Sequence, residues 1–200
     1  MAQDIAAIIL AAGASERMGQ PKALLPFGKV TILEHVIGVF RQAGVEELRV
    51  VVGHHADRLS PLLDRAGVTW VLNPHPESGM FSSVEAGIAS LPSRVRAFFV
   101  HPVDIPLVSP RTLRRLMRAQ PAEVVSPRSH GKTGHPPLLD AGLIPALMAF
   151  DGPGGLRGFL AQHRDHTCHI DCDDEGILVD VDTPQDYCKA CQTLSGVKGG

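Results

Sequence analysis

The hydrophobic residues of this chain form short apolar runs that alternate with amphipathic stretches. Four runs in the first half are typical of buried strands: Ile5–Leu10, Leu48–Val52, Val68–Leu72 and Ala97–His101. Apolar residues at helical spacing predict helices after them, namely Ile32 to Gly44, Ala56–Arg65, Ser83–Leu91 and Pro110–Ala119. Strands joined by helices indicate a parallel sheet with helices on both faces.

The second half continues this alternation less regularly. We expect strands at Glu123–Ser126, Cys168–Ile170 and Ile177–Val181, and helices near Ala141–Phe150, Leu156–Gln162 and Pro184–Leu194. A loop rich in Gly, Pro and His occupies Ser129–Pro137. The pattern predicts a single domain over residues 1–194, followed by a flexible tail at 195–200.

Composition narrows the classes of function. The chain has 200 residues, of which 44% are hydrophobic. It contains 19 Lys and Arg and 21 Asp and Glu, which gives a formal net charge of −2 at pH 7. This near-neutral balance argues against nucleic acid as a partner, because binding to a phosphate backbone needs clustered cations. No apolar run approaches the ~20 residues of a membrane-spanning helix. Asp4, rather than a basic segment, precedes the first apolar run, so a signal peptide is disfavoured and we expect a cytoplasmic protein.

Four cysteines raise the question of a metal site. The pairs Cys168/Cys172 and Cys188/Cys191 loosely resemble zinc-ligand spacing. Cys191, however, falls in a helical stripe with Tyr187, Ala190 and Leu194, which is typical of a buried helix face. We therefore favour core cysteines and leave zinc as the alternative.

The loop after the first strand carries candidate chemistry. Ligands of parallel sheets bind outside the carboxyl ends of the strands, and here the sequence LAAGASERMGQPK runs from Leu10 to Lys22. Small residues let main-chain N–H groups approach an anion, and Arg17 and Lys22 add two positive charges. The loop therefore predicts a polyphosphate site. It is neither a P-loop, since Gln20 follows Gly19, nor a G-x-G-x-x-G dinucleotide motif.

The same thirteen residues resemble the LAAGxSxRMGxPK signature of the MobA-like NTP transferases, and most closely its molybdenum cofactor cytidylyltransferase branch. The resemblance implies a Rossmann-like, three-layer α/β nucleotidyltransferase fold (GT-A-like) with a mixed, mostly parallel sheet. It implies that Arg17, Lys22 and Asp104 are catalytic. It also implies nucleotide contacts from the first loop, namely Leu10, Ala11, Ala12, Gly13, Ser15, Arg17 and Lys22.

Further segments extend the resemblance along most of the chain. ESGMFSSVEAGIASL is similar to a family segment that opens a helix near the nucleotide, which implies contacts from Gly79, Ser82 and Ser83, although Phe81 stands where a serine is common. HPVDIPLVSP resembles the metal loop that contains Asp104. TGHPPLL and GPGGLRGFL resemble later elements, which implies that His135 and Arg157 contact the acceptor. VDVDTPQDY, at Val179–Tyr187, is similar to the closing element.

Two carboxylates are candidates for a magnesium site. Asp104 follows a strand by two residues, and Asp182 lies just beyond the expected strand Ile177–Val181. Mg²⁺ prefers oxygen ligands and needs only one or two carboxylates beside substrate phosphates, so we expect both residues to hold Mg²⁺. Strand alternation places Asp180 on the same side as Asp182, as a third candidate. The alternative for Asp182 is that it caps the last helix.

The resemblance implies a reaction in which CMP passes from CTP to a molybdopterin-type acceptor with release of pyrophosphate. A target molybdoenzyme is then a further partner. The Ala11-Ala12-Gly13 run favours the cytidylyl over the guanylyl branch, whereas Ile105 departs from the Gln that often follows the metal Asp. Guanylyl transfer, sugar-phosphate nucleotidyl transfer and a non-catalytic cofactor carrier remain alternatives; a redox enzyme is disfavoured by the missing dinucleotide motif. His101 is a hypothetical positioning residue for the metal loop.

Overall fold

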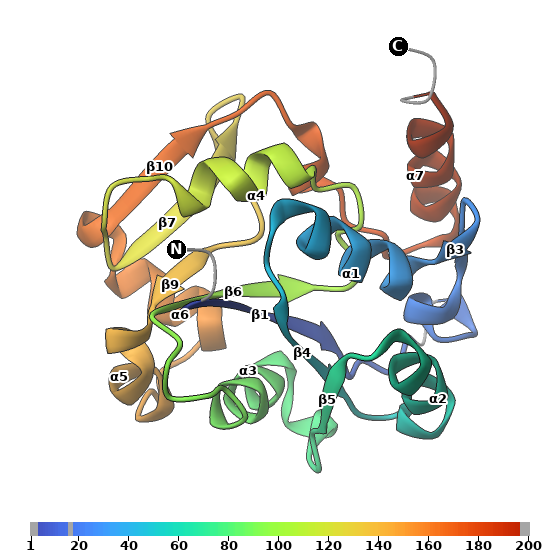
Figure 1. Ribbon diagram of the computed structural model, residues 1–200, viewed down its shortest axis with the longest axis horizontal. Helices are drawn as coiled ribbons and strands as arrows, with labels where there is room; N and C mark the ends of the chain where they lie inside the picture. The colour runs from blue at the N-terminus through green and yellow to red at the C-terminus, as the bar shows by residue number, and fades with distance from the viewer. Residues whose placement is uncertain (1–3, 16–17, 197–200) are drawn as a thin grey trace.

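The computed structural model describes residues 4–15 and 18–196 as a mixed β-sheet between two layers of helices (Figure 1). From one edge to the other, the sheet consists of β10 (Thr167–Asp171), β7 (Val124–Ser129), β9 (Leu138–Asp140), β6 (Ala97–Pro102), β1 (Ile5–Ala11), β4 (Glu47–Val52) and β5 (Thr69–Leu72), with β8 (Lys132–Thr133) paired to β7. All neighbouring pairs are parallel except those made by β9 and β8. This arrangement confirms the α/β, mostly parallel fold.

Helices cover both faces of the sheet. The α-helices are α1 (Ile32–Ala43), α2 (Ala56–Ala66), α3 (Met80–Ala89), α4 (Pro110–Met117), α5 (Ile144–Met148), α6 (Gly155–Gln162) and α7 (Pro184–Gly196). Figure 1 shows α1 and α4 above the sheet and α3 and α5 below it. A separate hairpin of β2 (Pro26–Phe27) and β3 (Val30–Thr31) precedes α1.

Side-chain alternation in β1 explains the two apolar layers. Ala7, Ile9 and Ala11 pack in one buried cluster with residues of α1, α2 and α4. Ala6, Ile8 and Leu10 point to the opposite face, where they pack with residues of α3, α5 and α6. Because successive strand residues face opposite sides, a strand buried on both faces must be apolar at every position. The run that begins at Ile5 meets this requirement.

The first-half predictions are confirmed with small shifts at the ends of elements. α3 begins at Met80 rather than Ser83, because Gly79, at φ 95°, ends the short 3-10 turn Pro76–Ser78 and starts the helix.

At the C-terminal end, α7 extends to Gly196, two residues past the expected end. The rest of the expected tail, residues 197–200, lies outside the described residues.

The expected strand Ile177–Val181 is wrong. A 3-10 turn forms at Glu175–Leu178, and the chain is irregular from there to Val181. Its main chain bonds two loops instead of a strand: Ile177 O accepts from His135 N at 3.0 Å, and Val181 N donates to Asp104 O at 2.8 Å. Ile177 and Val181 are fully buried in this form, so burial alone produced their apolar pattern.

The sequence pattern also missed β8 and β9. β9 is only three residues long and runs antiparallel between β6 and β7, and β8 forms a two-residue hairpin partner of β7 inside the expected loop Ser129–Pro137. Elements this short carry almost no periodicity.

Among the described residues, the structure contains no helix long and apolar enough to cross a membrane.

Candidate active site

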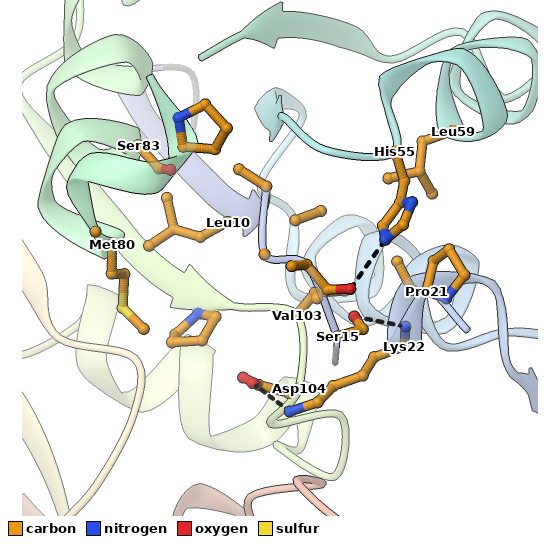
Figure 2. A pocket seen from close by; sticks show the side chains of 18 residues that line it. Leu10, Ser15, Pro21, Lys22, His55, Leu59, Met80, Ser83, Val103 and Asp104 are labelled. Carbon is orange, nitrogen blue, oxygen red and sulfur yellow. Dashed lines mark hydrogen bonds and ion pairs between the residues drawn. The ribbon is translucent and has the colours of Figure 1, made fainter. Parts of the chain in front are cut away.

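A cavity of about 390 Å³ opens where the loops after β1, β4 and β6 meet at the carboxyl edge of the sheet (Figure 2). The first loop lines it with all of its predicted residues that the structure describes: Leu10, Ala11, Ala12, Gly13, Ser15 and Lys22. Asp104 lines the same cavity from the loop after β6. The predicted residue Arg17 lies outside the described residues.

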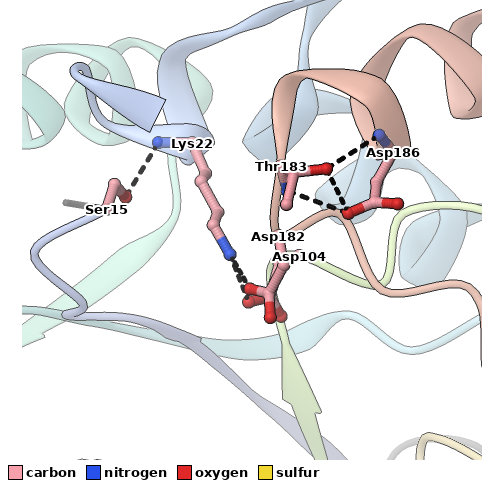
Figure 3. A network of polar contacts seen from close by, with 6 residues as sticks. All are labelled: Ser15, Lys22, Asp104, Asp182, Thr183 and Asp186. Carbon is pink, nitrogen blue, oxygen red and sulfur yellow. Dashed lines mark hydrogen bonds and ion pairs between the residues drawn. The ribbon is translucent and has the colours of Figure 1, made fainter. Parts of the chain in front are cut away.

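Lys22 connects the first loop to both predicted metal ligands. Its Nζ donates to Asp104 Oδ2 at 3.2 Å and to Asp182 Oδ1, across 82 and 160 positions of sequence (Figure 3). The lysine side chain is only 11% exposed. Burial by itself would lower the pKa of Lys22, but the hydrogen bond to Asp182 and the charges of both carboxylates outweigh it, so the pKa is raised. The ammonium is therefore charged at neutral pH.

Asp180 is the third carboxylate at this point. Oxygens of Asp104, Asp180 and Asp182 all lie within 4.8 Å of one another, as the sequence predicted, although an irregular segment rather than a strand brings Asp180 there. Clustered carboxylate oxygens are the donors that Mg²⁺ and Mn²⁺ prefer, so these residues fit such an ion.

The cap of α7 does not require Asp182. Thr183 is the residue that caps α7: its Oγ1 accepts from Asp186 N at 3.2 Å, and its own N–H donates to Asp186 Oδ2 at 2.9 Å (Figure 3). This reciprocal pair is a capping box with Asp in the place of Glu. The alternative role for Asp182 as the cap is thus wrong, and the carboxylate reaches Lys22 instead.

Two histidines that the sequence analysis did not single out brace the first loop. His54 Nδ1 lies 3.1 Å from Ala12 O and His55 Nε2 lies 3.0 Å from Ala14 O. The loop approaches so closely that a Cβ at Gly53 would lie 2.8 Å from Ala12 O. The only available signal was their position directly after a predicted strand.

The start of α3 forms another wall. Gly79 and Ser83 line the cavity, and Gly79 caps α3 without a side-chain hydrogen bond. Helix N-termini favour bound phosphate because the first N–H groups have no partner within the helix. Buried Asn73, another residue that the sequence analysis missed, donates to Ser82 Oγ at 2.8 Å and Ser83 Oγ at 2.9 Å. The Ser82 hydroxyl also donates to His75 O at 3.0 Å, and Ser82, unlike Gly79 and Ser83, does not line the cavity.

A second, larger cavity of about 990 Å³ adjoins the first, since Gly79 and Met80 line both. It contains the two predicted acceptor residues, His135 and Arg157. Arg164 also lines it, at the start of the 3-10 turn after α6, where no motif marked it. The first loop with Lys22 thus lines one cavity, and Arg157 and Arg164 line the other.

His101 is buried behind the metal loop, 1% exposed, with its ring 5.4 Å from that of Phe40. Burial lowers its pKa to about 3, the nearby His135 adds to this effect, and a hydrogen bond with the Ile105 main chain opposes it. It is therefore a neutral imidazole. It contacts the main chain directly after Asp104, and its positioning role stays a prediction.

The cysteines stay apart from any metal group. Within residues 4–15 and 18–196, the three aspartates are the only group of His, Cys, Asp and Glu with metal-ligand spacing. Cys191 packs against the core beside Ala190, as the helical stripe predicted, and Cys188 is exposed.

Comparison with known proteins matches one family, and we describe two similar proteins and one similar solved structure. Residues 7–167 match the family described as the MobA-like NTP transferase domain. Nicotine blue oxidoreductase of Paenarthrobacter nicotinovorans is 33% identical over 189 residues, which cover 90% of this chain and 92% of that protein. Molybdenum cofactor cytidylyltransferase of Escherichia coli is 27% identical over 184 residues, 92% of this chain and 93% of that one. The crystal structure of Rv0371c from Mycobacterium tuberculosis in complex with manganese has a TM-score of 0.79 and 26% identity, and the match covers 96% of this chain and 100% of that one.

Proposed function

The chain belongs to the MobA-like NTP transferase family and is an enzyme of the nucleotidyltransferase type, and from this premise we propose that it transfers CMP from CTP to the phosphate of a molybdopterin-type cofactor. Mg²⁺ is the proposed metal, and a cytoplasmic molybdoenzyme is the proposed recipient of the product. The cytosine preference rests on the Ala11-Ala12-Gly13 run.

One observation carries the proposal: Lys22, in a loop of the phosphate-binding type, contacts the carboxylate cluster, and both Lys22 and Asp104 line one cavity. A triphosphate needs N–H donors and cations along its length and a metal at its reacting end. The first loop, the start of α3 and Asp104 border one cavity, so a single bound triphosphate could meet all three.

The residues of the site have separate tasks in this reaction. First-loop N–H groups and Lys22 hold the triphosphate while the acceptor phosphate attacks the α-phosphorus and pyrophosphate leaves. A Mg²⁺ ion held by Asp104 and Asp182 would neutralise charge that develops on the α- and β-phosphates. The acceptor needs no general base, because a phosphate monoester with a second pKa of about 6 is already ionised at neutral pH.

The second cavity supports the choice of a bulky anionic acceptor. Arg157 and Arg164 place two guanidinium groups on its walls, and His135 lies beside them. Guanidinium groups bind phosphate in a bidentate manner. Because the two cavities adjoin at Gly79 and Met80, an acceptor held there would lie next to the triphosphate.

A redox function is the second candidate, because the 33% identical relative is named an oxidoreductase. The match covers 90% of this chain, so a redox reaction would use the same two cavities. Guanylyl transfer, sugar-phosphate nucleotidyl transfer and a carrier without catalysis are the remaining alternatives. They differ in whether a triphosphate binds and whether pyrophosphate is released.

The deciding experiment is calorimetric binding of CTP, GTP, ATP and UTP with Mg²⁺ to the wild type, Asp104→Ala and, as a control, Asp173→Ala. Asp173 is exposed and lies outside the carboxylate cluster. We expect CTP to bind best, Asp104→Ala to lose most of this affinity and Asp173→Ala to keep it. Pyrophosphate release in the presence of molybdopterin then distinguishes the enzyme from a carrier.

Preference for GTP would move the protein to the guanylyl branch. Absence of binding by all four nucleotides would contradict the proposal. In that case, reduction of an added dye by an added hydride donor, with no nucleoside triphosphate present, would favour the redox candidate.

A further inference from the structure

The Lys22 ammonium contacts two of the carboxylates that would hold a divalent cation. Nζ contacts one oxygen of Asp104 and one of Asp182, and the oxygens of these two aspartates and Asp180 lie within 4.8 Å of one another. A metal-bound oxygen lies only about 2.1 Å from Mg²⁺. An ammonium on the same two oxygens would therefore be in close repulsion with the ion.

The Lys22 side chain also has a second place to go. The same residue lines the cavity of the first loop, and its main-chain N–H is held by Ser15 Oγ at 3.0 Å. A lysine with a fixed main chain and a flexible four-carbon stem can swing its ammonium without moving the loop. Triphosphate oxygens in that cavity would replace the carboxylates as its partners.

We infer that Lys22 is a built-in counter-ion that exchanges with the divalent metal. In the nucleotide-free protein the ammonium holds Asp104 and Asp182 together and weakens metal binding; a bound triphosphate draws the ammonium into the first-loop cavity and so ends its contact with these two carboxylates. The metal thus binds strongly only when the nucleotide is present. This inference rests on the proposed function, because it takes the acidic cluster as the metal site.

The inference reverses the usual expectation for removing an active-site residue. Loss of Lys22 should weaken triphosphate binding, but it should strengthen metal binding in the absence of nucleotide. If Lys22 served only to bind phosphate, its loss would leave the metal affinity of the nucleotide-free protein unchanged. If it served only to stabilise the fold, its loss would lower that affinity.

The test measures Mn²⁺ binding by electron paramagnetic resonance of the free ion, without nucleotide. We expect Lys22→Met to bind Mn²⁺ at least fivefold more tightly than the wild type; a smaller gain overturns the inference. Lys29→Met, which removes an exposed lysine from the β2–β3 turn, controls for the change in net charge and should match the wild type. A gain of the same size in Lys29→Met also overturns the inference.

A second variant and a second readout guard against misfolding. Lys22→Gln removes the same charge, and Mn²⁺ should raise its thermal unfolding midpoint by more than that of the wild type. An equal or smaller shift counts against the exchange.

Mn²⁺ binding to the wild type with an α,β-methylene analogue of CTP distinguishes failure of the exchange from failure of the proposed metal site. If the wild type binds Mn²⁺ with the analogue while Lys22→Met shows no gain without it, the exchange fails and the proposed function stands. If the wild type binds no Mn²⁺ even with the analogue, the metal site of the proposed function fails, and the exchange fails with it.

Discussion

Asp104 joins the two halves of the candidate site through both its side chain and its main chain. Its carboxylate accepts from Lys22 in the first loop, and its carbonyl accepts from Val181 N in the closing segment. A residue with this pair of contacts allows charge and geometry to be tested separately, because an isosteric amide keeps the main-chain bond and the side-chain shape.

Asp104→Asn should reduce nucleotidyl transfer by at least about 100-fold, because the amide offers no negative charge to a metal. The measurement is pyrophosphate release with CTP and molybdopterin. Asp173→Asn, an exposed change in the chain leading to the closing segment, should keep nearly full activity. Transfer by Asp104→Asn at the wild-type rate would remove Asp104 from the site.

His101 makes the stability of the folded state depend on pH. Its folded pKa of about 3 lies below the ~6.5 of an unfolded histidine, so below pH 6.5 the unfolded chain binds a proton that the folded chain does not. Its contribution is therefore complete above about pH 6.5 and is lost as the pH falls toward 3. The slope is about 1 kcal/mol per pH unit between roughly pH 4.5 and 6.

His101→Leu should flatten this part of the pH profile of the free energy of unfolding, measured with urea at a series of pH values. The wild type, measured at the same pH values, is the reference. Equal slopes in His101→Leu and wild type would show that His101 is protonated in the folded protein.

At the scale of elements, α7 contributes to the site by how it begins. The capping box of Thr183 and Asp186 fixes the first turn directly after Asp182, and so aims that carboxylate at Lys22. α1 begins with an equivalent box, Thr31 with Glu34, which lies outside the residues that line either cavity. The two boxes are a matched pair, one at the site and one remote from it.

Thr183→Ala and Thr31→Ala should each lower the free energy of unfolding by about 1 kcal/mol, as loss of an N-cap generally does. Only Thr183→Ala should also weaken Mn²⁺ binding in the presence of the CTP analogue. Urea unfolding and a metal titration check the two effects. An equal loss of metal affinity in both variants would argue for a general effect of stability.

Elements were predictable where burial and periodicity agreed. β1 is buried on both faces and α1 has a capped, amphipathic pattern that stops at Gly44, so both emerge from local sequence. β9 has three residues and depends wholly on its neighbours β6 and β7. The segment at Ile177–Val181 has the apolar pattern of a strand, but its main chain bonds the loops at His135 and Asp104 instead of a strand.

At the scale of the whole molecule, two cavities adjoin, and under the proposed function one would hold the nucleotide donor and the other the acceptor. Lys22 and Asp104 belong to one, and Arg157 and Arg164 to the other. Gly79 and Met80 form the common border. A substitution deep in one cavity should therefore affect one substrate alone.

Arg157→Gln should raise the KM for molybdopterin about tenfold and leave CTP affinity unchanged, because one charge-assisted hydrogen bond contributes roughly 1.5–3 kcal/mol. Steady-state kinetics and calorimetry check the two quantities. Arg118→Gln, at the exposed end of α4, should change neither. An unchanged KM in Arg157→Gln would place the acceptor elsewhere.

The sequence by itself determined the alternating strands and helices, the first loop and the aspartates Asp104 and Asp182, because these depend on neighbouring residues and on local motifs. Only the tertiary structure decided what these residues do to one another. Lys22 and Asp182 are 160 positions apart, and their contact exists because the irregular segment before Asp182 is bonded to the loop after β6, where Val181 N donates to Asp104 O. The bracing of the first loop by His54 and His55 is likewise a product of folding. Such contacts join residues distant in sequence, and no local pattern encodes them.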